Sequence, residues 1–129
     1  QIQNAQLRLR VLDETIPPNV IVKGYPLLRD WDSAIVNWTK ASSGQPWSGP
    51  GASGSEDRAD AVTASESLTP SSYFWLDVTE LVQAWLADPS SQHGILLAVR
   101  SDDGAALYLG SLDHSLTDWR PRLEITLAP

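Results

Sequence analysis

A chain of 129 residues with 42% hydrophobic residues is long enough for one domain with a buried core, and this composition is not typical of a disordered protein. The formal net charge of −7 argues against nucleic acid and anionic membrane surfaces as partners, because both require a cationic protein surface. The absence of cysteine excludes disulfides, thiolate metal sites and thiol catalysis, and no apolar run is long enough for membrane insertion.

Alternating residues predict strands in the first part of the chain. In residues 2–12, apolar residues alternate with Gln6, Arg8 and Arg10, which is the pattern of one buried and one solvent-facing side. A second strand is expected in residues 20–27. Residues 41–72 are rich in Gly, Ser and Pro and form a long connection, with a short strand expected at 59–63. Neither side of this connection has enough strands to close a core alone, so residues 1–129 are interpreted as one domain.

A strand, a short helix and another strand are predicted in residues 73–99. The helix is expected at about 78–87, because Val78, Leu81, Val82 and Trp85 fall on one helical face. Asp77 is expected to cap its start, together with Glu80 three residues later. The Asp-Pro pair at 88–89 is expected to end it.

The last third of the chain carries a turn signal and a final strand. Asp102-Asp103-Gly104 between apolar runs predicts a hairpin, and residues 122–127 alternate as a strand. Many short strands with one helix favour a mostly β protein, an antiparallel β-sandwich of the jelly-roll type with one short α-helix.

A set of spaced residues runs through most of the chain: Ala5-x-Leu7-x-Leu9, Trp31…Val36-x-Trp38, Phe74-x-x-Asp77-Val78-Thr79-x-x-Val82-x-x-Trp85, Gly94-Ile95-x-Leu97 and Pro121-x-Leu123-x-Ile125. This set resembles the DNRLRE domain family, whose members are jelly-roll modules of large secreted or cell-surface bacterial and archaeal proteins. Some members are similar to alginate-binding carbohydrate modules, and others accompany enzymes that degrade cell-wall polysaccharide. The resemblance implies an extracellular or cell-surface location and structural roles for Asp77, Trp31, Trp38 and Trp85.

The chain departs from the family pattern at its start. Family members begin with further strands upstream of the Ala-x-Leu-x-Leu strand, which here lies almost at Gln1. The domain is therefore expected to lack the family's N-terminal strands. Because an unpaired sheet edge attracts another strand, they are expected to come from another polypeptide, such as a complementary N-terminal fragment.

The residues argue against an enzyme. A hydrolase needs a nucleophile, a base and an orienting group, but the nearest approach to a nucleophile elbow, residues 51–55, lacks the last glycine and follows no predicted strand. The paired Asp102 and Asp103 are better explained by the hairpin turn than by glycoside cleavage.

Metal binding is a weaker expectation. Two distant histidines, His93 and His114, make zinc a poor candidate, whereas acidic loops can supply the oxygen ligands that Ca²⁺ requires. The loop candidates for Ca²⁺ include Asp102, Asp103, Asp113 and Asp118. The acidic residues Glu56, Asp57 and Asp60 are interpreted as a solvated charge run.

The aromatic residues divide into two groups. Four are expected in the core, namely Trp31, Trp38, Trp75 and Trp85. Trp47, Trp119 and Tyr108 lie in less core-like segments and are the candidates for exposed ligand contacts. The alternative for the first two is that each covers an end of the sandwich, with Trp47 holding its long loop in place.

Two functions compete at this level. The first is a noncatalytic, extracellular carbohydrate-binding module of a larger protein, with Arg8 and Arg10 among the arginines that could pair with the carboxylates of an acidic sugar. The negative net charge weakens that pairing with a polyanion and leaves neutral glycans open. The second is a structural or adhesive subunit of a cell-surface assembly, completed by strands from other protein chains.

Overall fold

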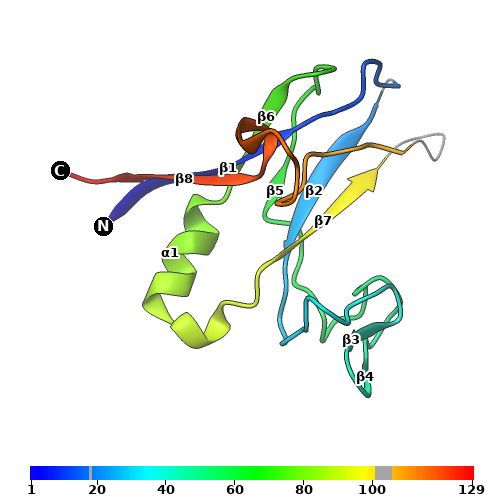
Figure 1. The fold of residues 1–129 in the computed structure, drawn as a ribbon. Helices are drawn as coiled ribbons and strands as arrows, with labels where there is room; N and C mark the ends of the chain where they lie inside the picture. Colours follow the sequence, from blue (N-terminus) through cyan, green and yellow to red (C-terminus); the bar gives the residue numbers. More distant parts are fainter. Residues whose placement is uncertain (18, 101–105) are drawn as a thin grey trace.

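The computed structural model describes residues 1–17, 19–100 and 106–129 (Figure 1). The protein is mostly β, with antiparallel pairing and one short α-helix, as predicted. Its elements are β1 (Ile2–Arg10), β2 (Ile21–Pro26), β3 (Lys40–Ser42), β4 (Gln45–Pro46), β5 (Thr63–Ala64), β6 (Tyr73–Asp77), α1 (Thr79–Ala87), β7 (Ile95–Arg100) and β8 (Arg122–Leu127), with 3₁₀ turns at Pro89–Ser91 and Thr117–Trp119. Within the described ranges, no helix is long and apolar enough to cross a membrane.

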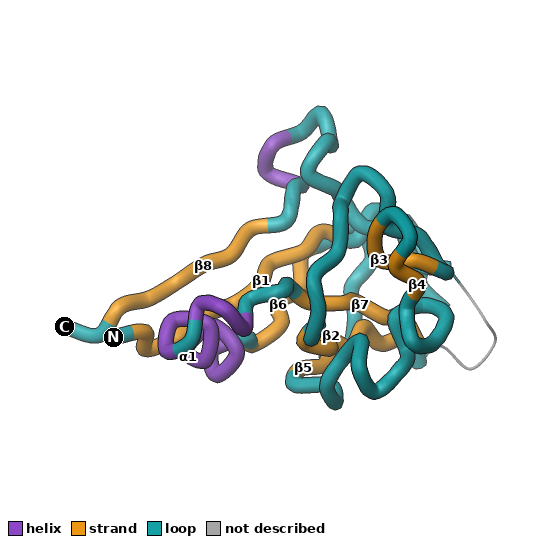
Figure 2. The backbone as a smooth tube through the Cα atoms, turned by 90° about the horizontal axis from the view of Figure 1, so that it is seen from below, coloured by secondary structure: helices purple, strands orange, loops and turns teal. Residues whose placement is uncertain are grey.

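Two three-stranded sheets form the body of the molecule. Their strand orders are β6-β1-β8 and β5-β2-β7, and β3 pairs with β4 in a separate small hairpin. Figure 2 shows α1 beside β1 at the end where the chain termini lie, and the β3–β4 region at the opposite end. The alternation in β1 places Leu7 across from Leu76 of β6 and Leu123 of β8, so one face of this sheet is apolar.

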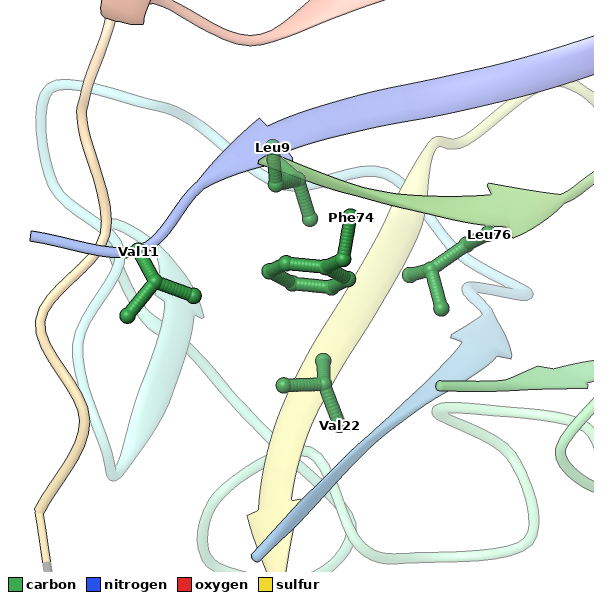
Figure 3. Packing of buried hydrophobic residues seen from close by; sticks show 5 residues of the cluster. All are labelled: Leu9, Val11, Val22, Phe74 and Leu76. Carbon is green, nitrogen blue, oxygen red and sulfur yellow. The ribbon is translucent and has the colours of Figure 1, made fainter. Parts of the chain in front are cut away.

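The central core joins the two sheets. Leu9, Phe74 and Leu76 from the first sheet meet Val22 of β2, and Val11 extends the cluster (Figure 3). Leu76, Val11 and Val22 are fully buried. Burial of one such side chain contributes about 1.5–3 kcal/mol, so this cluster stabilises the contact between the two sheets.

The helix α1 covers one end of this core. Val78 and Val82 are buried against Ile2 and Ala5 of β1, and Leu81 and Trp85 pack at the margin, which confirms the predicted apolar face of the helix. Asp88 ends the helix, as expected, with its N–H bonded to the Ala84 carbonyl.

The predicted capping box at the start of α1 forms only in part. The helix begins at Thr79, so the N-cap position falls on Val78, whose side chain makes no capping bond. Asp77 lies one residue too early and instead accepts from the Thr79 N–H at 3.0 Å and from the Thr79 hydroxyl at 2.7 Å. The same hydroxyl accepts from the Ala5 N–H at 2.9 Å, so Asp77 still has a structural role in tying the helix to β1.

The predicted hairpin after β7 falls mostly outside the described residues and stays a prediction. Its turn residues Asp102 and Asp103 lie outside the described residues. Beyond them, Leu109 pairs with Val11 at the end of β1, whereas β7 pairs with β2. The described part of this segment, at Leu109, therefore contacts the first sheet.

The long connection after β3 has a small core of its own. Trp47 is only 8% exposed and packs with Leu27, Ala41 and Ala52, and its Nε1 donates to the Asn37 carbonyl at 2.9 Å. Trp47 therefore does not offer an exposed ring, and the alternative that it holds its loop describes the structure. A buried tryptophan with its N–H satisfied fixes a segment that lacks regular strands.

Three tryptophans expected in the core are instead exposed. Trp38 is 72% exposed and rests on the Gly51 backbone, Trp75 is 49% exposed and Trp31 is 40% exposed. The expectation of a core position is therefore wrong for Trp38 and Trp75, and Trp31 lies at the surface. Trp31 and Trp38 lie in the connection between β2 and β3, and Trp75 lies on the side of β6 opposite the core residues Phe74 and Leu76.

Candidate ligand-binding face

The outer face of the β6-β1-β8 sheet carries a cluster of arginine and aromatic side chains. Because side chains alternate along a strand, Arg8 and Arg10 of β1 point away from the core that Leu9 fills. The register places Trp75 of β6 across from Arg8 and Tyr73 across from Arg10. Together with Trp119, these residues are called here the arginine–aromatic face.

The guanidinium groups stack on the aromatic rings. The Cζ atom of Arg10 lies 4.9 Å from the ring centre of Tyr73 and 4.4 Å from that of Trp119, so this group is held between two rings. The Cζ atom of Arg8 lies 4.3 Å from the same Tyr73 centre. Each cation–π contact is worth about 0.5–2 kcal/mol, and the stacking fixes the orientation of both groups.

No carboxylate within the described ranges neutralises these two positive charges. Among the described residues, neither Arg8 nor Arg10 forms an ion pair with a carboxylate, and the Nε atom of each is buried without a hydrogen-bond partner. Arg8 donates from Nη2 to the Asp118 carbonyl at 2.8 Å, while the Asp118 carboxylate pairs with Arg122 at 3.7 Å. Two adjacent, preorganised guanidiniums favour an anionic ligand group.

The loop of residues 110–120, which is cross-linked by its own hydrogen bonds, holds Trp119 in place. Its ring lies 5.1 Å from the ring of His114, measured between centres, and His114 Nδ1 accepts from the Leu116 N–H at 3.0 Å. Arg120 donates from Nε to the His114 carbonyl at 2.8 Å. Gly110 passes so close to the Trp119 carbonyl that a Cβ would collide with it. The ring therefore reaches the face in a fixed position.

Trp75 extends the aromatic surface across β6. Its ring centre lies 6.3 Å from that of Tyr73 at an angle of 44°, and its Nε1 donates to Glu124 of β8 at 2.7 Å. The ring is oriented by this bond while half of its surface stays exposed. The sequence analysis did not identify Tyr73 or Trp75 as site residues. The alternation in β6, with Phe74 and Leu76 inward, could have identified them.

A polar groove of about 460 Å³ runs beside the face, between β6 and the β5 segment. Tyr73 and Trp75 line it together with Gln6, Asp77, Thr63 and Glu66. A hydrogen bond from the Thr79 hydroxyl and a second from its N–H lower the pKa of Asp77, against the opposing effect of partial burial. Asp77 is thus a charged acceptor at neutral pH, and the groove offers polar partners for hydroxyl groups.

The structure brings together three of the five predicted ligand contacts: Arg8, Arg10 and Trp119. Tyr108 is 65% exposed on the neighbouring segment, where its N–H donates to Asp13 at 2.8 Å, and it makes none of the ring contacts of the face. Trp47 is buried in the loop core described above and takes no part in the face.

The described residues do not form the calcium site that the acidic loops suggested. Asp102 and Asp103 lie outside the described residues, Asp118 pairs with Arg122, and Asp113 lies in a surface turn. No three His, Cys, Asp or Glu side chains gather as a metal site within the described part of the chain.

Comparison with protein-family models, curated protein sequences and solved structures found no match. The resemblance to the DNRLRE domain family, and the jelly-roll topology that it implies, therefore stay predictions.

Proposed function

We propose that this chain is a noncatalytic, extracellular carbohydrate-binding module whose arginine–aromatic face takes an acidic polysaccharide. The observation that carries the proposal is the pair of guanidiniums of Arg8 and Arg10, stacked on aromatic rings and without a carboxylate partner among the described residues. A sugar carboxylate fits the planar, two-pronged donor geometry of arginine.

The neighbouring groups match the rest of a sugar chain. The exposed ring of Trp75 offers an apolar surface for the C–H groups of a pyranose, and the groove beside it offers acceptors and donors for hydroxyls. The net charge of −7 repels a polyanion at long range, so binding is expected to be slow at low salt and to depend on local contacts rather than on steering.

A comparison of polygalacturonate with neutral cellohexaose by titration calorimetry tests the proposal. Replacement of Arg10 by glutamine should weaken polygalacturonate binding at least tenfold, because it removes one charge-assisted pair. Arg58 is a matched control, since its Cζ stacks 4.0 Å from the ring centre of Tyr25, outside this face. Equal losses for R10Q and R58Q, or no binding of polygalacturonate by the wild type, would contradict the proposal.

A second candidate function is a structural or adhesive subunit that is completed by a strand from another chain. The observation that favours it is β8, a terminal strand of its sheet whose core-side residues Leu123, Ile125 and Leu127 are 45%, 44% and 67% exposed. Apolar residues at alternate positions of an unpaired edge suit an added β-strand.

Native mass spectrometry, with and without chelator, tests this second candidate. A complex that Ile125→Lys dissociates would support strand addition, because the charge would lie on the apolar face that the added strand extends, next to that strand's own side chains. A wild-type protein that stays monomeric at high concentration, and captures no partner strand, would exclude it.

A further inference from the structure

A second surface depression lies away from the arginine–aromatic face. Its volume is about 290 Å³, and it is lined by Asp30, Trp31, Gln92, His93 and Gly94. These residues come from the loop after β2 and from the turn that leads into β7, which belong to the other sheet. They contribute nothing to the function proposed above.

The ring of Trp31 is fixed in place but not covered. Its Nε1 donates to the His93 carbonyl at 2.6 Å, which sets the orientation of the indole. Gly94 has a φ of +88°, and a Cβ there would lie 3.6 Å from Trp31 Cζ2, so the ring lies directly beside this backbone. The indole nevertheless remains 40% exposed. A large aromatic ring that is oriented by a hydrogen bond and open to solvent is a preformed stacking platform.

Polar groups surround this platform. Asp30 Oδ1 lies 2.9 Å from His93 Nδ1, and the Asp30 side chain is 98% exposed. The imidazole lies beside Oδ1, so Oδ2 faces solvent and can accept from a ligand. The side-chain amide of Gln92 adds donors and an acceptor at the same rim.

We propose that this depression is a separate sugar subsite, which stacks a neutral pyranose on Trp31 and binds its hydroxyls through Asp30 and Gln92. An apolar ring face with a few polar groups at its rim matches the two sides of a pyranose, its C–H face and its hydroxyl edge. The carboxylate of Asp30 repels an acidic sugar, so this subsite selects the opposite ligand class from the arginine–aromatic face. The proposal does not depend on acidic polysaccharide binding at that face.

Two-dimensional ¹H–¹⁵N NMR of the tryptophan indole groups tests the proposal on the whole chain. The Trp31 signal is assigned by its loss in the Trp31→Phe variant. Cellohexaose, mannohexaose and xylohexaose are titrated separately to about 10 mM, which populates a site of millimolar affinity. We expect at least one of these neutral probes to shift the Trp31 signal, while the Trp38 signal, from a ring that is 72% exposed elsewhere, does not move.

The variant Asp30→Asn then tests the polar rim. Its side chain is almost fully exposed, so the fold should survive the change, and we expect about tenfold weaker binding of the active probe. An unmoved Trp31 signal with all three neutral probes would overturn the proposal, and so would equal shifts at Trp31 and Trp38. Unchanged affinity in D30N would overturn the role of the carboxylate.

The acidic probe separates this subsite from the proposed function. Polygalacturonate binding and its loss in R10Q report on the arginine–aromatic face, whereas the neutral probes and D30N report on Trp31. R10Q should leave the cellohexaose, mannohexaose and xylohexaose titrations unchanged, so either proposal can fail without the other. A loss of the Trp31 shift in R10Q would refute the independence of the two sites.

Discussion

Replacement of Asp57 by asparagine should destabilise the protein by about 3 kcal/mol at pH 7. The Asp57 side chain is fully buried, and Oδ1 accepts from the Ser48 N–H at 2.9 Å and from Arg29 Nη1 at 3.3 Å. Oδ2 accepts from the N–H groups of Gly49 and Gly54, each at 3.0 Å. An amide has one acceptor oxygen, so in either orientation two donors lose their partner. Each buried donor left unsatisfied costs about 1–3 kcal/mol.

The pH dependence of this effect follows from the pKa of Asp57. Burial alone would raise that pKa, but the backbone N–H groups of Ser48, Gly49 and Gly54 and the Ser48 hydroxyl outweigh burial and lower it from 3.8 to about 2. Because the folded pKa lies below the ordinary value, the stabilisation is present above pH 3.8 and is lost as the pH falls towards 2. At 1.36 kcal/mol per pKa unit, the interval from 3.8 to about 2 corresponds to about 2 kcal/mol.

Urea denaturation of the wild type and of D57N from neutral pH down to about pH 2 measures both effects. The difference between their unfolding free energies should be largest near neutral pH and should narrow by about 2 kcal/mol in acid. Glu56→Gln is the matched control, because Glu56 is the exposed neighbour in the same segment and should change stability by less than about 0.5 kcal/mol. A D57N loss below about 1 kcal/mol, or a difference that is constant with pH, would refute the reasoning.

Two further predictions concern the sheets and the helix. Leu76→Ala should cost about 3–5 kcal/mol of unfolding free energy, since Leu76 is fully buried between the sheets, and a loss near 1 kcal/mol in denaturant titration would contradict that core. Thr79→Val removes the hydroxyl that donates to Asp77 and accepts from the Ala5 N–H, so the pKa of Asp77 should rise towards its ordinary value and stability should fall by about 1–2 kcal/mol. NMR titration of the carboxyl groups measures the pKa of Asp77, and denaturation measures the loss of stability. An unchanged Asp77 titration would argue against the hydrogen bond from the Thr79 hydroxyl.

Local periodicity accounts for what could be predicted. The two-residue alternation in residues 2–12 predicted β1, observed at Ile2–Arg10, and with it the outward position of Arg8 and Arg10. The spacing of Val78 and Val82 predicted the buried face of α1 to within a residue or two of its ends. These features depend on contacts between near neighbours in the chain, so their signal is contained in a short window of sequence.

Long-range contacts account for what could not be predicted. Asp57 was expected in a solvated charge run, but its side chain is buried. The N–H groups that bond to its carboxylate belong to Ser48, Gly49 and Gly54, in a loop that folds around it. The pairing of Leu109 with Val11 likewise joins residues that lie far apart in the sequence. The approach of Trp119 to Arg10 depends on how residues 110–120 return to the sheet, for which the sequence carries no periodic signal.

The pairing of β1 with β8 determines how the domain would respond to tension. Ile2 pairs with Leu127, and the Ala128 N–H donates to the Gln1 carbonyl at 2.9 Å, so both ends of the chain leave the sheet side by side (Figure 1). A force that pulls the two ends apart acts perpendicular to the strands and would break the hydrogen bonds between β1 and β8 one after another. Antiparallel neighbours loaded in this direction resist far less than strands made to slide past each other. As a link in a stretched chain, the domain would open early and from this corner first.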